Sequence, residues 1–299
     1  MIVFFFCVTI CSETGKRGPN EVTKMVIFDI DGTLRDEISG IPKSAKRAVK
    51  QLRERGILVY ICTGRSVGTI PRDVLELEPD GIIAGGGCYI SIGGAEKKRK
   101  SFSPQTIADL MEWMREHPEG GFSLETQETV FLNRRGADML MAANDRKWGA
   151  LGREEQKRIL REGRIRYEDN MEVLRPETER VHKICFWDEA DEWQELRERI
   201  GPHALAQKED WMGTDYYELV AKGCDKGTAV LELCRMTGIS PEEVMGFGDG
   251  KNDLDFLRVT GVSVAMENGA PVVKEAADSV CERPDQDGIY RELKRRKVI

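Results

Sequence analysis

Met25–Leu34, which reads MVIFDIDGTL, is the stretch from which the fold of this chain can be predicted. It opens with four apolar residues and continues through Asp29 and Asp31 into a Gly-Thr pair. A short, unbroken apolar run that ends at a turn signal is typical of a buried parallel strand. Ligands of open α/β sheets bind beyond the carboxyl ends of such strands. The stretch therefore predicts a site at the two aspartates, although a DxDG run by itself is more often an ordinary turn.

Strands and helices alternate after this first strand. A segment with apolar residues at helical spacing precedes two further apolar runs, Ile57–Cys62 and Gly81–Ala84, which we interpret as strands. The alternation returns at Lys226 and includes the predicted strands Val244–Phe247 and Val262–Met266. This order is typical of a Rossmann-like α/β fold with a doubly wound parallel sheet.

Residues 88–215 follow another pattern. Strands and helices are mixed there without strict alternation, and one very charged helical stretch covers about Arg153–Glu162. We therefore expect an α+β domain inserted between the third and fourth strands of the core. The predicted division is a core of residues 25–87 and 216–299 with an inserted domain of residues 88–215.

Residues 1–24 do not continue the pattern that begins at Met25. Ile2–Ile10 is an apolar run too short to span a bilayer, and no positive charge precedes it as in a secretory signal. We expect Met25 to be the native start and residues 1–24 to be an extension outside the fold. A lipid-attached or uncleaved leader is the alternative.

Length and composition describe an ordinary globular protein. The 299 residues correspond to about two domains, and 40% are apolar while 32% are charged. The formal charge of -7, without a long basic run, argues against nucleic acid or a membrane as partner. The eight cysteines form no CxxC pair, which indicates reduced thiols and a cytoplasmic location. We expect a monomer or a homodimer.

Four polar clusters stand at the carboxyl ends of predicted core strands or at the start of a core helix. They are Asp29 with Asp31, Thr63 with Gly64, Lys226, and Asp249 with Asn252 and Asp253. Each cluster is a weak signal alone, because such residues usually form turns or face solvent. Their joint occurrence, in this order and on alternate elements, is a strong signal.

The residue types in these clusters indicate a particular chemistry. Three carboxylates in one crevice need a divalent cation, and a set of oxygen ligands without histidine or cysteine favours Mg²⁺. The Thr63 hydroxyl and the Lys226 ammonium suit phosphate oxygens, and the backbone N–H of Gly64 adds a donor. The sequence therefore predicts a site that binds a phosphoryl group and Mg²⁺ together.

The same segments resemble a known family. DIDGT, TGR, the Lys226-Gly227 pair and GDGKND are similar to the four motifs of the haloacid dehalogenase (HAD) superfamily. ELVAKGCDKG and VAMENGAPVVKEAADSV resemble its Cof-like branch, the subfamily IIB sugar phosphatases. The resemblance covers Met25 to the C-terminus. The long interval between Thr63 and Lys226 matches an α/β cap of the C2 type, subtype B.

The resemblance implies roles for the acidic residues. Asp29 matches the nucleophile that becomes an aspartyl phosphate, and Asp31 matches the general acid/base. Asp29 and Asp249 match direct Mg²⁺ ligands, and Asp253 a direct or supporting one. Asp31 would bind the metal through its backbone carbonyl. As an acid, Asp31 must hold a proton well above its reference pKa of ~3.9, and we expect burial and neighbouring negative charge as the causes.

The resemblance also implies how phosphate is held. Thr63 and Lys226 match the groups that bind the transferred phosphoryl group, and Asn252 is expected to reach it as well. One departure concerns Gly86-Gly87-Cys88, which stands where Cof-like relatives carry Asn-Gly-Ala, at the hinge into the cap. The departure removes a side-chain amide and adds backbone freedom.

The predicted function is a Mg²⁺-dependent phosphatase acting on a small phosphorylated metabolite, with a sugar phosphate as the leading class. A phosphomutase of the phosphomannomutase type and a non-catalytic phosphosugar sensor are the alternatives. The cap is expected to contact the leaving group. The cap residues that could make this contact are as readily explained as surface charges. They are Arg134, Arg135, Arg180 and Lys183. Arg65 fits a substrate contact or a structural salt bridge.

Overall fold

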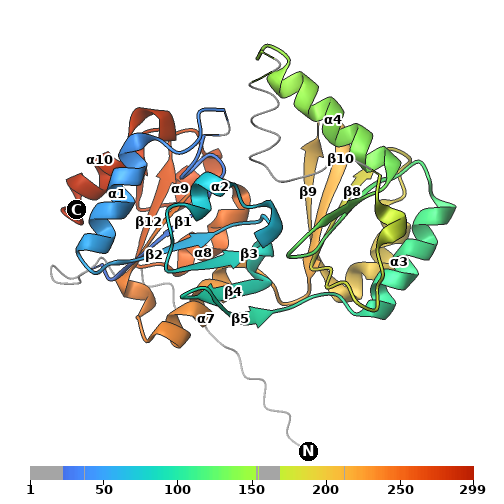
Figure 1. Ribbon diagram of the computed structural model, residues 1–299, viewed down its shortest axis with the longest axis horizontal. Helices are drawn as coiled ribbons and strands as arrows, with labels where there is room; N and C mark the ends of the chain where they lie inside the picture. The colour runs from blue at the N-terminus through green and yellow to red at the C-terminus, as the bar shows by residue number, and fades with distance from the viewer. Residues whose placement is uncertain (1–22, 37, 153, 155–168, 212) are drawn as a thin grey trace, which may run out of the picture.

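The computed structural model describes residues 23–36, 38–152, 154, 169–211 and 213–299 (Figure 1). The predicted extension therefore lies outside the described residues, except for its last two positions. The charged helix expected at about Arg153–Glu162 lies outside them as well, apart from one residue. Among the described residues, no helix is long and apolar enough to cross a membrane.

An eight-stranded sheet forms the core, in the order β13-β12-β11-β1-β2-β3-β4-β5. All neighbours from β13 to β3 are parallel, and the β4–β5 hairpin extends the sheet with antiparallel pairs. The strands are β1 Met25–Phe28, β2 Leu58–Cys62, β3 Gly81–Ala84, β4 Tyr89–Ile92, β5 Ala95–Arg99, β11 Val244–Gly248, β12 Val262–Met266 and β13 Ser279–Cys281. The prediction of a parallel α/β core is confirmed.

Helices cover both faces of this sheet, and β1 shows why its sequence is apolar throughout. Val26 and Phe28 pack in one cluster with residues of α1 and α10, whereas Met25 and Ile27 pack on the other side with α7 and α8. Successive side chains of a strand point to opposite faces, so a strand covered on both sides needs an unbroken apolar run. The core helices are α1 Lys43–Glu54, α2 Arg72–Leu75, α7 Lys226–Thr237, α8 Leu254–Val259, α9 Pro271–Ala276 and α10 Gly288–Arg295.

A second, fully antiparallel sheet of five strands has the order β7-β6-β8-β10-β9. Its strands are β6 Gly121–Glu125, β7 Val130–Leu132, β8 Lys183–Asp188, β9 Ala204–Trp211 and β10 Thr214–Ala221. With the helices α3 Pro104–Glu116, α4 Arg134–Trp148 and α6 Trp193–Ile200, it fills the right half of Figure 1. The expected α+β insertion is confirmed, and we call this unit the cap.

The two faces of the cap sheet differ. One face is apolar and packs against α3 and α6, with Phe122, Phe186 and Leu219 among its buried residues. On the other face, Trp187 and Tyr216 contact residues of α4. The remainder of that second face lies toward the core, where it borders the site described below.

Strand pairing moves the predicted domain bounds. The β4–β5 hairpin pairs with the core sheet and β10 pairs with the cap sheet, so the chain crosses after Arg99 and after Ala221 instead of at 87/88 and 215/216. The two crossings are neighbours. The backbone N–H of Lys100 donates to the Cys88 carbonyl at 2.8 Å, and a Cβ added to Gly223 would lie 2.8 Å from Lys100 Nζ.

Candidate active site at the carboxyl end of the core sheet

The polar clusters predicted from the sequence meet beyond the carboxyl ends of β1, β2 and β11. One cavity of about 200 Å³ is lined by Asp29, Asp31, Thr63, Gly64, Asp249, Asn252 and Asp253, together with Arg65, Lys183 and Glu218. Lys226, the first residue of α7, lines an adjoining cavity of about 100 Å³. The structure thus brings every predicted catalytic, phosphate-binding and metal-binding residue to one place.

Lys226 joins two of the buried carboxylates. Its Nζ donates to Asp29 Oδ1 at 2.8 Å and to Asp253 Oδ1 at 2.6 Å. Burial, followed by the charges of Asp253 and Asp249, raises the pKa of Asp29 well above its usual value, and Lys226 opposes this shift. Burial disfavours the Lys226 ammonium, but the two carboxylates outweigh burial and raise its pKa. The lysine therefore stays charged beside the expected nucleophile.

Asp249 and Asp253 are held by the loop that follows β11. The Thr33 hydroxyl donates to Asp249 Oδ1 at 2.7 Å, and burial raises the pKa of Asp249 to about 6. The backbone N–H groups of Asp249 and Gly250 donate to Asp253 Oδ2 at 2.9 and 2.8 Å. With Lys226 on Oδ1, both oxygens of Asp253 are engaged. Asp253 therefore orients its neighbours more readily than it binds a metal directly.

The donor set fits a hard cation. Oxygens of Asp29, Asp249 and Asp253 lie within 4.8 Å of one another. Like charges at this separation raise one another's pKa, and a bound cation would relieve the repulsion. Magnesium prefers carboxylate oxygens of this kind together with water and phosphate. Asp29 and Asp249 are the residues whose remaining oxygens could hold it.

Asp31 departs from expectation. We expected a buried side chain, but it is 42% exposed, and the expectation was wrong. Arg65 Nε donates to Asp31 Oδ2 at 2.5 Å, and Arg65 Nη2 donates to Oδ1 at 2.8 Å. Arg65 Nη1 also donates to the Thr69 carbonyl at 3.0 Å, which fixes the guanidinium over the loop after β2. Of the two alternatives for Arg65, the structure shows the salt bridge.

Thr63, Gly64 and Asn252 lie together at the end of β2. The buried Thr63 hydroxyl accepts from the Arg65 backbone N–H at 3.1 Å. A Cβ added to Gly64 would lie 3.6 Å from Asn252 Nδ2, so the amide lies against this glycine. These groups face the cavity, and their assignment to phosphate stays a prediction.

The cap supplies two side chains to the site. Lys183 was a candidate from the sequence, whereas Glu218 was not, and both line the two cavities. Arg134 and Arg135 are elsewhere: they begin α4, line a separate cavity and pair with Asp138 and Glu189. Arg180 lines neither of the two cavities at the site. The only sequence signal for Glu218 was its place at the start of ELVAKGCDKG.

The turn between β3 and β4 of the core sheet contains Gly86-Gly87-Cys88, which we expected at the hinge into the cap; that expectation was wrong, because the chain crosses only after Arg99. Gly85, Gly86 and Gly87 have φ values of 58°, 62° and 99°, in the left-handed region that favours glycine. A Cβ on Gly85 would overlap the His182 ring, and one on Gly87 would overlap the Asp225 carbonyl. Glycine at positions 85 and 87 therefore lets this turn approach both the cap and the start of α7.

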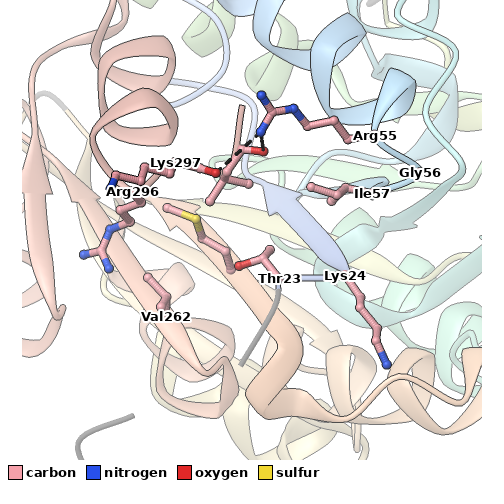
Figure 2. Close-up of a pocket in the computed structure, with 10 residues that line it drawn as sticks. Thr23, Lys24, Arg55, Gly56, Ile57, Val262, Arg296 and Lys297 are labelled. Carbon is pink, nitrogen blue, oxygen red and sulfur yellow. Dashed lines mark hydrogen bonds between the residues drawn. The ribbon is translucent and has the colours of Figure 1, made fainter. Parts of the chain in front are cut away.

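A larger cavity of about 580 Å³ opens near the amino end of β1 (Figure 2). Two of its charged side chains are engaged: Lys24 Nζ lies 2.6 Å from Glu243, and Arg55 donates to the carbonyls of Lys297 and Val298. In Figure 2 the Lys24 ammonium points away from the other labelled residues. None of the predicted site residues lines this cavity, so size does not identify the functional site.

Known proteins resemble this chain over most of its length. The model of the haloacid dehalogenase-like hydrolase family matches residues 26–293. A putative bifunctional phosphatase/peptidyl-prolyl cis-trans isomerase of Streptococcus pyogenes is 28% identical over 284 residues, and the match covers 92% of this chain but only 54% of that protein. The 5-amino-6-(5-phospho-D-ribitylamino)uracil phosphatase YwtE of Bacillus subtilis is 27% identical, with 89% and 95% covered.

A solved structure shares the fold. The HAD subclass IIB sugar phosphatase BT4131 superposes with a TM-score of 0.71 at 25% sequence identity. The superposition covers 93% of this chain and all of that chain, 100%. The likeness therefore extends over both the core and the cap.

Proposed function

Because the chain belongs to the haloacid dehalogenase-like hydrolase family, we propose that it is a Mg²⁺-dependent phosphatase that hydrolyses a small phosphorylated metabolite through an aspartyl phosphate. A sugar phosphate is the leading substrate class. The observation that carries the proposal is the contact of Lys226 with Asp29 and Asp253, beside Asp249 and the Thr63 hydroxyl. Relatives named as phosphatases support the reaction type.

In the first step, an Asp29 oxygen attacks phosphorus as the bond from phosphorus to the leaving oxygen breaks. Asp31 gives its proton to that oxygen, so the product leaves as an alcohol. Lys226 and Thr63 supply charge and a hydroxyl to the phosphoryl oxygens, on which the charge of the transition state is spread. Bound Mg²⁺ would be held by Asp29 and Asp249 and would neutralise part of that charge.

In the second step, ionised Asp31 takes a proton from water, and the water oxygen attacks phosphorus of the aspartyl phosphate. Phosphate leaves, and the Asp29 carboxylate is restored. The Arg65 contact favours the ionised form of Asp31, which is the form that this step needs. Proton donation in the first step requires that contact to loosen.

The test is phosphate release from a panel of phosphorylated metabolites in the presence of Mg²⁺, with Asp29→Asn as the inactive comparison. A hydrolase releases inorganic phosphate in step with substrate loss. A phosphomutase would instead return the phosphoryl group to a sugar hydroxyl without net release. Absence of release from every substrate, p-nitrophenyl phosphate included, would refute the proposed function.

A further inference from the structure

The half of the inner cap face that α4 leaves uncovered is polar. Glu125 of β6 pairs in register with Lys183 of β8, and Glu218 of β10 pairs with Cys185, two residues further along β8. Side chains two apart on a strand share a face, so Glu125, Lys183 and Glu218 lie on one surface. Because Lys183 and Glu218 line both cavities at the site, this surface forms their wall on the cap side.

Contacts within this wall fix the Glu218 carboxylate. Lys183 Nζ lies 3.0 Å from Glu218 Oε1 and 3.6 Å from Glu125 Oε1, and the Tyr216 hydroxyl donates to Glu218 Oε1 at 2.9 Å. The core adds one more contact, from the Ser66 hydroxyl to Glu125 Oε2 at 3.2 Å. Lys183 thus has two carboxylate neighbours, and its charge is matched within the cap.

Glu218 differs from Glu125 in lining both cavities at the site. The contacts that Glu218 makes with Tyr216 and Lys183 in the described part of the chain go through Oε1, and its side chain is 31% exposed. Burial opposes ionisation, but Lys183 and the hydrogen bonds from Lys183 and Tyr216 lower the pKa of Glu218. Oε2 is therefore a charged acceptor at the cavity wall.

An ionised acceptor distinguishes between leaving groups by chemistry. A hydroxyl of the leaving group can donate a hydrogen bond to Oε2. A carboxylate or phosphate at neutral pH cannot donate one, and its negative charge is repelled by Glu218. Asp225 and Asp255 also line the smaller cavity, so its carboxylates outnumber its two lysines. One of these lysines, Lys226, is already engaged by Asp29 and Asp253.

We propose that Glu218, oriented by Lys183 and Tyr216, selects substrates with a neutral, polyhydroxylated leaving group and rejects those with a second anionic group at that end. This inference rests on the proposed phosphatase function. It assigns substrate preference to a residue of the cap, whereas bond cleavage stays with the core.

The experiment compares pairs of monophosphates that differ only at the far end of the carbon chain. Glycerol 3-phosphate is paired with 3-phosphoglycerate, erythritol 4-phosphate with 4-phosphoerythronate, and sorbitol 6-phosphate with 6-phosphogluconate. Each pair replaces a terminal hydroxymethyl group with a carboxylate. The wild-type enzyme is expected to favour the alcohol by at least about tenfold in kcat/KM in the pair whose length reaches Glu218.

Glu218→Gln keeps the shape and removes the charge. It is expected to lower the preference in that pair to about threefold or less, mainly by raising kcat/KM for the carboxylate member. Asp215→Asn is the matched control, because it makes the same charge change on the same strand but three residues away, on the opposite face. It is expected to keep the wild-type preference.

Hydrolysis of p-nitrophenyl phosphate distinguishes failure of the Glu218 inference from failure of the proposed phosphatase function. If this ester is hydrolysed but the wild-type enzyme shows no preference for the alcohol at any length, the role of Glu218 is refuted and the phosphatase function stands. If it is not hydrolysed either, both proposals fall. A preference that Glu218→Gln leaves intact also refutes the inference, and melting curves establish that this variant is folded. If the variant does not fold, the wild-type length series alone decides.

Discussion

Arg65 holds Asp31 by two hydrogen bonds, from Nε to Oδ2 at 2.5 Å and from Nη2 to Oδ1 at 2.8 Å. A paired, planar contact of this kind favours the carboxylate over the carboxylic acid. The contact thus favours the ionised form of the residue that we propose as proton donor. This pairing links the proposed acid/base, Asp31, to the loop after β2.

The first prediction concerns Arg65→Met. Loss of the guanidinium removes a group that favours the Asp31 carboxylate, so the fall in kcat/KM at high pH should move to higher pH. Arg65→Lys keeps the positive charge but cannot make the paired contact. The high-pH fall in its kcat/KM should therefore lie between those of the wild-type enzyme and Arg65→Met. The measurement is kcat/KM against pH with a sugar phosphate, and a limb that moves to lower pH would contradict the role of Arg65.

The second prediction concerns Asp29, the proposed nucleophile. Asn at position 29 keeps the shape of the side chain but cannot form an acyl phosphate, so Asp29→Asn should lower turnover by several orders of magnitude. Asp109→Asn, on the exposed side of α3, is the control and should keep wild-type turnover. Acid quench during turnover of a ³²P-labelled substrate should find the label on the wild-type protein and none on Asp29→Asn. Absence of labelled wild-type protein, with inversion of configuration at phosphorus, would favour direct attack by water.

The third prediction concerns the metal. Chelation should abolish turnover and added Mg²⁺ should restore it, whereas Ca²⁺ should inhibit because its larger coordination number disturbs the in-line geometry. Burial raises the pKa of Asp249 to about 6, so protons should compete with Mg²⁺ as the pH falls below that value. The Mg²⁺ concentration for half activity should therefore rise between pH 7 and pH 5. Full turnover in chelator would exclude the metal role.

The fourth prediction concerns His182, whose ring lies against Gly85. Burial, with the nearby charges of Lys183 and Arg99, lowers its pKa from 6.5 to about 3. As the pH falls, His182 therefore becomes protonated near pH 6.5 in the unfolded chain but only near pH 3 in the folded protein. His182 should thus cost about 1.4 kcal/mol of stability for each pH unit below 6.5.

The comparison for His182 is His182→Gln, because other titrating groups cancel in the difference. Urea unfolding from pH 7 to pH 5 should show the wild-type protein losing more free energy of unfolding than the variant. Parallel curves for the two proteins would show that the imidazole is not held neutral.

The fifth prediction concerns Gly85. Gly85→Ala should destabilise the protein by about 3 kcal/mol, since it adds a methyl group against the His182 ring to the cost of a positive φ. Gly56→Ala is the control: its φ is 73°, a Cβ there would meet no atom within 4 Å, and the cost should be about 1 kcal/mol. Unfolding curves give both values, and equal costs would refute the clash.

The core site could be predicted because its residues follow parallel strands, whose carboxyl ends meet at one edge whatever the rest of the chain does. To predict that Asp29, Thr63 and Asp249 share a site, it was enough to know which strand each one follows. The orientation of Asp31 could not be predicted, because it depends on how the Arg65 side chain returns to the sheet from the next strand.

The cap residues were harder to predict for another reason. Polar residues at alternate positions of an antiparallel strand are typical of a face in contact with solvent. Glu125 and Glu218 fit that pattern, and only the position of the cap over the core makes their face part of a cavity. The domain bounds failed similarly, because the β4–β5 hairpin has no sequence feature that assigns it to the core sheet.

The nearness of the two crossings between core and cap has a consequence for how such enzymes diversify. Lys100 and Gly223 bound a segment whose ends are neighbours, so its removal or exchange would leave no gap in the core sheet. A segment of this kind is a module that recombination can replace as one piece. Descendants of one ancestral core could therefore acquire new substrates by changing the cap alone while inheriting the phosphoryl-transfer machinery unaltered.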